Sequence, residues 1–194
     1  MLYLYRMSSH HVVREKQEPA LLVLGMDNFS DEHLGQLLEW SPTVIATEIM
    51  AEKLNSEGIK VDWVLTDVAP DFQSDVKQLR LDGQTGVNAA MGFLTQNQYP
   101  SVNVVADEVN PDDYEQYVSL INLVIFSGDE KIYPVYSGFS KWKPAGEEIK
   151  VLSEIADLQI TGLRAIGPNI YQTIVDGIFS LKFNGLFVFL SETL

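Results

Sequence analysis

The sequence lacks cysteine altogether and has little positive charge. Without cysteine the chain has no disulfide, no thiolate nucleophile and no cysteine-ligated zinc site. Its 13 lysine and arginine residues stand against 27 aspartate and glutamate residues, which gives a formal net charge of −14. A chain this acidic is repelled by phosphate backbones and by anionic lipid surfaces. We therefore expect neither nucleic acid nor a membrane as its partner.

Long apolar runs are also missing. No segment approaches the roughly 18 consecutive apolar residues that a membrane helix needs, and the opening MLYLYRMSSHH is too short an apolar run for a signal peptide. We therefore expect a cytoplasmic protein. A hydrophobic content of 46% over 194 residues is enough to build a buried core, in one domain or two small ones.

Apolar runs alternate with helical segments through the first two thirds of the chain. Strands are expected at residues 20–26, 43–46, 59–65, 102–106 and 123–126. Helices are expected at 30–40, before Gly58, at 72–81, after a loop within 84–94, and at 110–120. This order predicts an α/β fold with an open, mostly parallel sheet, flanking helices and right-handed crossovers.

Beyond about residue 127 the pattern changes to short alternating segments separated by turn residues. Asn184-Gly185, between residues 177–183 and 186–190, is a strong signal for a two-residue hairpin. Apolar residues on both sides of that hairpin indicate that both faces are covered, one by the core and one by a second subunit. We therefore predict an antiparallel β-sandwich, with an α/β domain at residues 1–126 and an all-β domain at 127–194.

The most informative stretch is strand–helix–strand over residues 43–65, followed by Asp67. An acid at the carboxyl end of a parallel strand lies where open α/β sheets bind ligands. Asp67 is therefore either a metal or ligand residue, or a cap of the following turn through an Asx bond. Glu48 opens a helix, where the helix dipole alone would favour it. Thr85 has the character of a helix N-cap.

The order and spacing of these segments resemble the thiamine pyrophosphokinase family over nearly the whole length. The segments that carry the resemblance are ALLVLG, VIATEIMAEKL, GIKVDWVLTDVAPD, QTGVNAAMGFL and TGLRAIGP. The resemblance implies an α/β catalytic domain followed by a thiamine-binding β-sandwich. It also implies transfer of a pyrophosphoryl group from ATP to thiamine, giving AMP and thiamine diphosphate, with magnesium (Mg²⁺) held by acidic residues. Members of the family are usually homodimers that bind thiamine where the subunits meet.

The family's signature residues are mostly replaced. The family has Asp-Gly-Gly-Ala where this chain has EIMA at residues 48–51, and Gly-Asp-x-Asp-Ser where it has TDVAP at 66–70. The aspartate of the family's Thr-Asp-Leu-Glu segment is replaced by Gly86 in this chain. The family's Gly-Gly-Arg-x-Asp-His segment has no counterpart at residues 106–110.

Of the family's two acids after the third strand only Asp67 remains, and Asp71 could stand in for the second. In an active enzyme with relocated acids, Asp67 and Asp71 are the catalytic, metal-binding residues, and Glu48 and Thr85 lie near the nucleotide; the resemblance assigns no thiamine-binding residue. Each electrostatic group of this kind contributes on the order of 2.7–4 kcal/mol to transition-state stabilisation. The leading hypothesis is therefore a family member with impaired or no catalysis. The alternatives are an active enzyme with relocated acids, and a non-catalytic homodimeric module that binds a small ligand.

Overall fold

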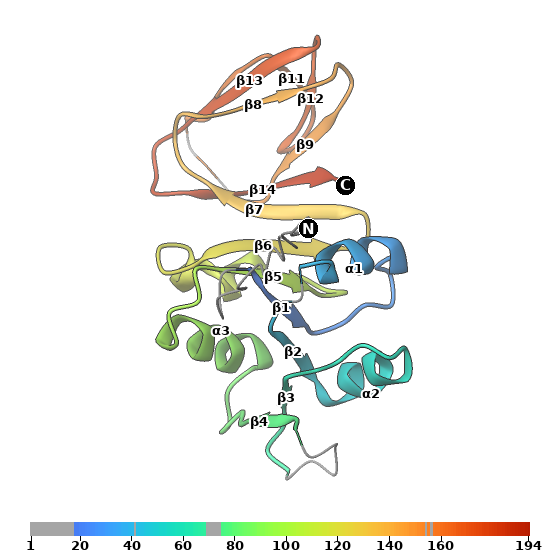
Figure 1. The fold of residues 1–194 in the computed structure, drawn as a ribbon. Helices are drawn as coiled ribbons and strands as arrows, with labels where there is room; N and C mark the ends of the chain where they lie inside the picture. The colour runs from blue at the N-terminus through green and yellow to red at the C-terminus, as the bar shows by residue number, and fades with distance from the viewer. Residues whose placement is uncertain (1–17, 41, 69–74, 154, 156) are drawn as a thin grey trace, which may run out of the picture.

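The computed structural model describes residues 18–40, 42–68, 75–153, 155 and 157–194. Its main feature is a mixed sheet of 11 strands, accompanied by a separate antiparallel sheet of 3 strands (Figure 1). The α/β class that the sequence predicts is confirmed in this form, with the parallel strands at one end of the large sheet. None of the helices in the described part is long and apolar enough to cross a bilayer.

Six strands of the large sheet are parallel, in the order β6-β5-β1-β2-β3-β4. Their bounds are β1 Ala20–Val23, β2 Val44–Thr47, β3 Trp63–Leu65, β4 Lys77–Leu79, β5 Ser101–Val105 and β6 Asn122–Ser127. All of β1 is buried, as expected for a parallel strand covered on both faces. The chain moves outward from β1 to β4 and returns on the other side of β1 with β5, so the strand order reverses between β1 and β5.

Helices cover both faces of the parallel strands. Helices α1 (Asp31–Leu38) and α2 (Glu48–Ser56) pack on one face, and α3 (Gly86–Gln96) packs on the other with two 3-10 turns, η1 (Pro111–Asp113) and η2 (Glu115–Tyr117) (Figure 1). Each α-helix begins after a hydroxyl side chain that accepts a backbone N–H three residues further on. These N-caps are Ser30, Thr47 and Thr85.

Two expected helices are wrong. The helix predicted at 72–81 is replaced by strand β4, which pairs with the free edge of β3; the N–H of Lys77 donates to the carbonyl of Asp62, 2.9 Å away. Residues 72–74 lie outside the described part. The helix predicted at 110–120 forms only η1 and η2. Tyr114, between the two turns, and Tyr117, at the end of η2, are buried in the core on this face of the sheet. In both places tertiary packing overrides local propensity.

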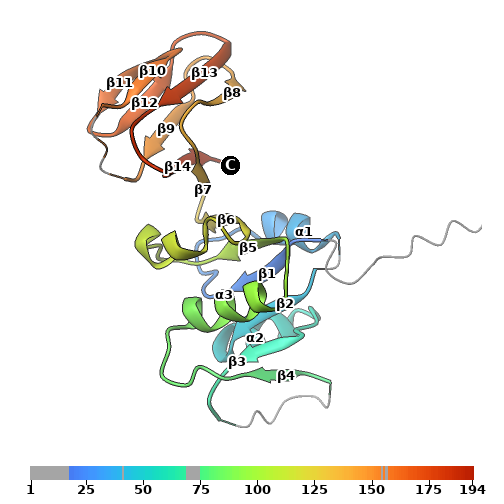
Figure 2. The same cartoon turned by 90° about the vertical axis from the view of Figure 1, so that its left-hand side faces the viewer.

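The antiparallel strands form two layers, seen most clearly from the side in Figure 2. The large sheet continues from β6 through β7, β14, β9, β12 and β11, and the small sheet has the order β10-β13-β8. A core lies between the layers, with Phe179 and Leu181 of the small sheet against Ile149 and Leu190 of the large one. The bounds are β7 Glu130–Val135, β8 Phe139–Lys143, β9 Glu148–Val151, β10 Gln159–Thr161, β11 Leu163–Gly167, β12 Ile170–Thr173, β13 Gly177–Lys182 and β14 Val188–Thr193.

The hairpin predicted at Asn184-Gly185 is wrong. Strand β13 pairs with β8 and β10, whereas β14 pairs with β7 and β9. Asn184 and Gly185 therefore lie in the connection from the small sheet to the large one. The physical reason is that Leu181 and Leu190 face each other across the core between the layers, so their strands cannot share an edge.

The boundary predicted between residues 126 and 127 falls within a tight hairpin of the large sheet. Strands β6 and β7 pair antiparallel, with Ser127 opposite Glu130 and only Gly128 and Asp129 between them. Gly128 has a φ of 55°, a conformation that glycine adopts without steric cost. Because the sheet is continuous here, the division into two domains stays a prediction.

Glu192 of β14 forms a buried ionic cluster between the two sheets. Its side chain is only 4% exposed and pairs with the ammonium groups of Lys141 and Lys143 on β8, the latter 3.1 Å from Oε2. Burial raises the pKa of Glu192, but the hydrogen bonds and charges of the two lysines outweigh it, so the pKa lies below its usual value. The carboxylate is therefore ionised at neutral pH, and it ties the small sheet to the large one.

Candidate functional site

Polar residues follow strands β2, β3 and β5 where each strand ends. Glu48 comes directly after β2, Asp67 is two residues beyond β3, and Asp107 is two residues beyond β5. The carboxyl ends of parallel strands meet at one edge of a sheet, and open α/β sheets bind ligands at that edge where the strand order reverses. This edge, next to β1 and β5, is therefore the candidate functional site.

Asp67 is held by the backbone that follows β4. Its Oδ1 accepts the N–H of Leu81 at 2.9 Å and the N–H of Asp82 at 3.0 Å. The carboxylate thus joins the end of β3 to the turn after the edge strand β4. An Asx bond would reach the turn that directly follows Asp67, whereas the observed partners lie 14 and 15 residues further along.

Glu48 leans toward the end of the neighbouring strand. The buried hydroxyl of Thr66 lies 3.5 Å from Oε2 of Glu48, accepts the N–H of Val68 at 3.2 Å and lies 3.3 Å from the Val68 carbonyl. Glu48 is also the first residue of α2, where the positive end of the helix dipole favours a carboxylate. The structure therefore brings Glu48 and Thr66 together, with Asp67 adjacent in the chain.

The first turn of α3 lies over the same edge. A Cβ placed on Gly86 would come within 3.5 Å of Leu24, just after β1, and 3.7 Å of Leu65, at the end of β3. Thr85 accepts the N–H of Asn88 at 3.2 Å, so the predicted N-cap is confirmed. The first turn of α3 is partly buried at this edge, and its leading backbone N–H groups have no carbonyl partner within the helix.

Asp107 is a residue of this edge that sequence reasoning missed as a site residue. Its Oδ1 accepts the N–H of Asn28 at 3.2 Å, and its Oδ2 lies where a Cβ on Gly25 would be only 2.3 Å away. Because Gly25 has no side chain, the carboxylate of Asp107 can lie against the backbone just after β1. The available signal was a glycine just after one buried strand combined with an acid just after another.

The described residues do not provide a ready magnesium site. Asp71, the second predicted metal ligand, lies outside the described residues. Within the part that the structure describes, no three His, Asp or Glu side chains come together in a metal-binding group, and Oδ1 of Asp67 already accepts two N–H groups. Mg²⁺ demands near-octahedral oxygen coordination at short distances, and this arrangement does not fit it.

The role of Asp67 can be tested by a pair of substitutions. We expect Asp67→Ala to lower the free energy of unfolding by about 1–2 kcal/mol, because two backbone N–H groups lose a charged acceptor. Asp67→Asn keeps an acceptor oxygen and should cost roughly half as much. Urea denaturation followed by circular dichroism measures both. Equal stability of Asp67→Ala and the parent would contradict the structural role.

Solved structures provide the comparison with known proteins. No protein-family model matches the chain, and no curated protein sequence matches it. Thiamine pyrophosphokinase from Bacillus subtilis superimposes with a TM-score of 0.60 at 13% identity, over 91% of this chain and 99% of its own. The enzyme from Geobacillus thermodenitrificans gives 0.69 at 10% identity, over 90% and 97%. The one from Candida albicans gives 0.63 at 11% identity, over 91% and 89%.

These similarities extend over both halves of the chain, while the identities are too low to transfer a residue's role. The resemblance that the sequence suggests is therefore confirmed at the level of the fold: this chain has the fold of the thiamine pyrophosphokinases.

Proposed function

We propose that this chain is a thiamine pyrophosphokinase-like protein with little or no pyrophosphoryl transfer activity. The observation that carries the proposal is the commitment of Asp67 to the backbone of Leu81 and Asp82. In the family pattern this acid is followed by a second one two residues on, and here that position is Ala69. Asp67, the acid that this segment retains, therefore has a structural role at the edge where the family places its chemistry.

The loss of glycines supports the same proposal. The family places two glycines after the strand that corresponds to β2, where this chain has Ile49 and Met50. Glycine lets a backbone approach a phosphate closely, whereas Met50 is buried in the core and Ile49 is 74% exposed. Phosphoryl-transfer catalysis consists mainly of positioning and electrostatic stabilisation. Each lost group costs on the order of 2.7–4 kcal/mol in the transition state.

The deciding experiment measures AMP release from ATP in the presence of thiamine and Mg²⁺, with the Bacillus subtilis enzyme as positive control. Loss of two such groups predicts turnover at least about 10⁴-fold below that control. Ordinary turnover that disappears in both Asp67→Asn and Asp71→Asn would overturn the proposal. It would instead support an active enzyme with Asp67 and Asp71 on magnesium and Glu48 and Thr85 near the nucleotide.

Ligand binding without turnover is the remaining alternative. The first turn of α3 favours it, because the backbone N–H groups at a helix N-terminus suit an anionic group. Thermal unfolding with ATP, thiamine and thiamine diphosphate, each with and without Mg²⁺, tests this. A rise in melting temperature with any of them, without AMP release, would support a small-ligand-binding module. Unchanged melting temperatures with all three compounds would contradict a module that binds ATP, thiamine or thiamine diphosphate.

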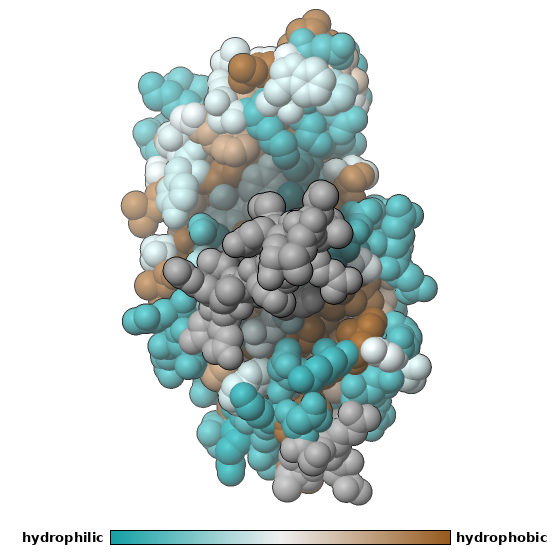
Figure 3. Space-filling view, viewed as in Figure 1, coloured by the Kyte–Doolittle hydropathy of each residue, from teal (hydrophilic) through white to brown (hydrophobic). Residues whose placement is uncertain are grey.

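We also propose that the chain is a homodimer that uses the outer face of the small sheet. Trp142 and Ile178 are directly paired across β8 and β13, and they are 60% and 67% exposed. Figure 3 shows hydrophobic residues scattered among hydrophilic ones on the visible surface of the antiparallel part of the chain. Paired exposed apolar side chains of this size are typical of an interaction surface.

Light scattering after size exclusion tests the dimer. We expect the parent chain to have twice the mass of one subunit and Ile178→Asp to have the mass of a monomer, because a buried unpaired carboxylate disfavours association. Leu120→Asp is the matched control, since Leu120 is 63% exposed but lies outside the small sheet. A parent chain that is monomeric at high concentration would exclude the dimer.

A further inference from the structure

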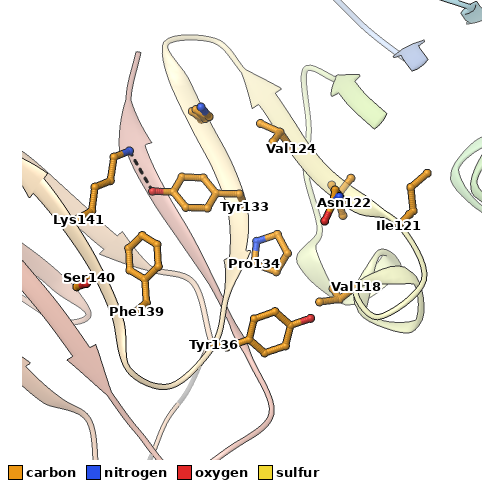
Figure 4. Close-up of a pocket in the computed structure, with 12 residues that line it drawn as sticks. Val118, Ile121, Asn122, Val124, Tyr133, Pro134, Tyr136, Phe139, Ser140 and Lys141 are labelled. Carbon is orange, nitrogen blue, oxygen red and sulfur yellow. Dashed lines mark hydrogen bonds between the residues drawn. The ribbon is translucent and has the colours of Figure 1, made fainter. Parts of the chain in front are cut away.

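A cavity of about 390 Å³ lies where the parallel half of the large sheet meets the small sheet. Its walls come from three places: the segment around Val118 and Asn122 before and within β6, strand β7 with Tyr133, and strand β8 with Lys141 (Figure 4). Its volume falls in the range of about 300–1,000 Å³ that small-molecule sites occupy. The cavity is therefore large enough for a small organic ligand.

The cavity is distinct from the candidate site at the carboxyl edge. Asn122, which lines it, is the first residue of β6 and so marks the amino end of the parallel strands. Glu48, Asp67 and Asp107 follow the carboxyl ends of these strands. An inference about the cavity therefore does not depend on the proposed function.

Aromatic rings make up much of the lining. Tyr133, Tyr136 and Phe139 line the cavity from β7, β8 and the turn between them (Figure 4). The rings of Tyr133 and Phe139 already contact each other edge to face, with centroids 6.2 Å apart. Aromatic side chains prefer such edge-to-face and offset-stacked contacts, so these walls suit a planar aromatic group.

Positive charge gathers at one end of the cavity, in a chain whose net charge is −14. The ammonium groups of Lys131 and Lys141 lie 5.7 Å and 5.4 Å from the centroid of the Tyr133 ring. Lys141 donates to the Tyr133 hydroxyl at 3.3 Å, as drawn in Figure 4, and pairs with Glu192. Among the ion pairs of the described residues, none includes Lys131.

The charges at this end of the cavity indicate which ligand charge the site favours. Besides Lys131 and Lys141, the cluster contains Lys143, which pairs with Glu147 as well as with Glu192. Glu192 and Glu147 thus balance Lys141 and Lys143, and the ammonium group of Lys131, which lines the cavity, leaves one positive charge in excess. A single carboxylate would balance that charge. A phosphate monoester carries roughly −1.5 to −2 at pH 7 and would leave excess negative charge beside Glu192.

We propose that this cavity binds a small aromatic monocarboxylate. The planar ring lies against Tyr133, Tyr136 and Phe139, and the carboxylate pairs with the ammonium group of Lys131. Lys141 keeps its bonds to Tyr133 and Glu192 and adds a second positive charge nearby. Partial burial of Lys131 makes this pair stronger than an ion pair on the open surface.

The test compares two probes of the same shape, 2-naphthoate and its neutral amide 2-naphthamide, by saturation-transfer NMR and calorimetry. We expect the carboxylate to bind about tenfold more tightly than the amide, the effect of one charge-assisted hydrogen bond. Lys131→Gln should remove this preference and leave amide binding unchanged. Lys131→Arg should keep the preference. Lys182→Gln, an exposed lysine outside the cavity, should change neither affinity.

A second variant tests, independently of charge, whether the probes bind in this cavity. Asn122 is exposed at the rim, so Asn122→Trp should fold normally and fill the cavity, and we expect it to weaken both probes by tenfold or more. Equal affinity of the two probes for the parent chain would overturn the proposal. So would absence of binding by either probe, or full binding of 2-naphthoate to Asn122→Trp.

Discussion

Replacing Glu192 with glutamine is expected to lower the free energy of unfolding by about 3–4 kcal/mol. The carboxylate is 4% exposed and faces two lysine ammonium groups, of which Lys143 is only 15% exposed. Removing one partner of a buried ion pair costs about 3–5 kcal/mol, and the pairing of Lys143 with Glu147, which remains in the variant, keeps the expected loss at the lower end of that range. Glutamine keeps the shape and a hydrogen-bonding oxygen, so the loss in free energy of unfolding measures the effect of removing the negative charge. Urea denaturation at pH 7, followed by circular dichroism, measures it.

Two comparisons make this result specific. Glu148→Gln removes a carboxylate that is 44% exposed and 3.9 Å from Lys150, and it should cost less than about 1 kcal/mol. The pKa of Glu192 is lowered in the folded state, so its contribution is complete above the unfolded-state value of roughly 4.3 and is lost as the pH falls through the folded-state value. The difference between parent and Glu192→Gln should therefore shrink below about pH 4. A difference under 1 kcal/mol at pH 7 would contradict the assigned role of the cluster.

Gly162→Ala is expected to destabilise the chain by about 3 kcal/mol. Gly162 links β10 to β11 with a φ of +75°, and a Cβ there would lie 2.9 Å from the carbonyl oxygen of Ile178 and 3.1 Å from the Cα of Phe179. A left-handed conformation costs an L-residue roughly 1–2 kcal/mol, and overpacking adds about 1–3 kcal/mol. Both close atoms belong to the backbone of β13, so the new methyl group can be accommodated only by moving a strand.

Gly146→Ala separates these two contributions. Gly146 has a φ of +88°, and a Cβ there would have no atom within 4 Å. This variant should therefore show the conformational cost alone, about 1–2 kcal/mol. Thermal and urea unfolding of the two variants, measured side by side, gives the steric part by difference. Equal destabilisation by both would mean that β13 yields to the added methyl group.

Both positions bear on function because they hold the small sheet in place. Glu192 fixes β8 to β14, and Gly162 allows the chain to pass close to β13. Strand β8 carries Trp142 of the proposed dimer surface and Lys141 of the cavity. A variant that loosens these contacts should therefore weaken dimerisation and 2-naphthoate binding together, whereas Ile178→Asp and Lys131→Gln should each affect only one of them.

The sequence by itself determined the elements whose signals are local. The fully apolar run of β1 requires cover on both faces. The hydroxyl side chains of Ser30, Thr47 and Thr85 fix the starts of the three α-helices, since an N-cap and its N–H partner are only three residues apart. The order of strands and helices was enough to suggest the fold that the solved structures share.

Only the tertiary structure decided the features that depend on distant partners. Residues 77–79 form a strand because the edge of β3 supplies hydrogen bonds, and β13 and β14 separate because their side chains meet across a core. Asp67 finds its N–H partners 14 and 15 residues away, and Asp107 is 82 residues from Gly25, over which it closes. Local propensity is read from neighbours in the chain, whereas edge pairing, layering and the environment of a carboxylate are set by segments that meet only after folding.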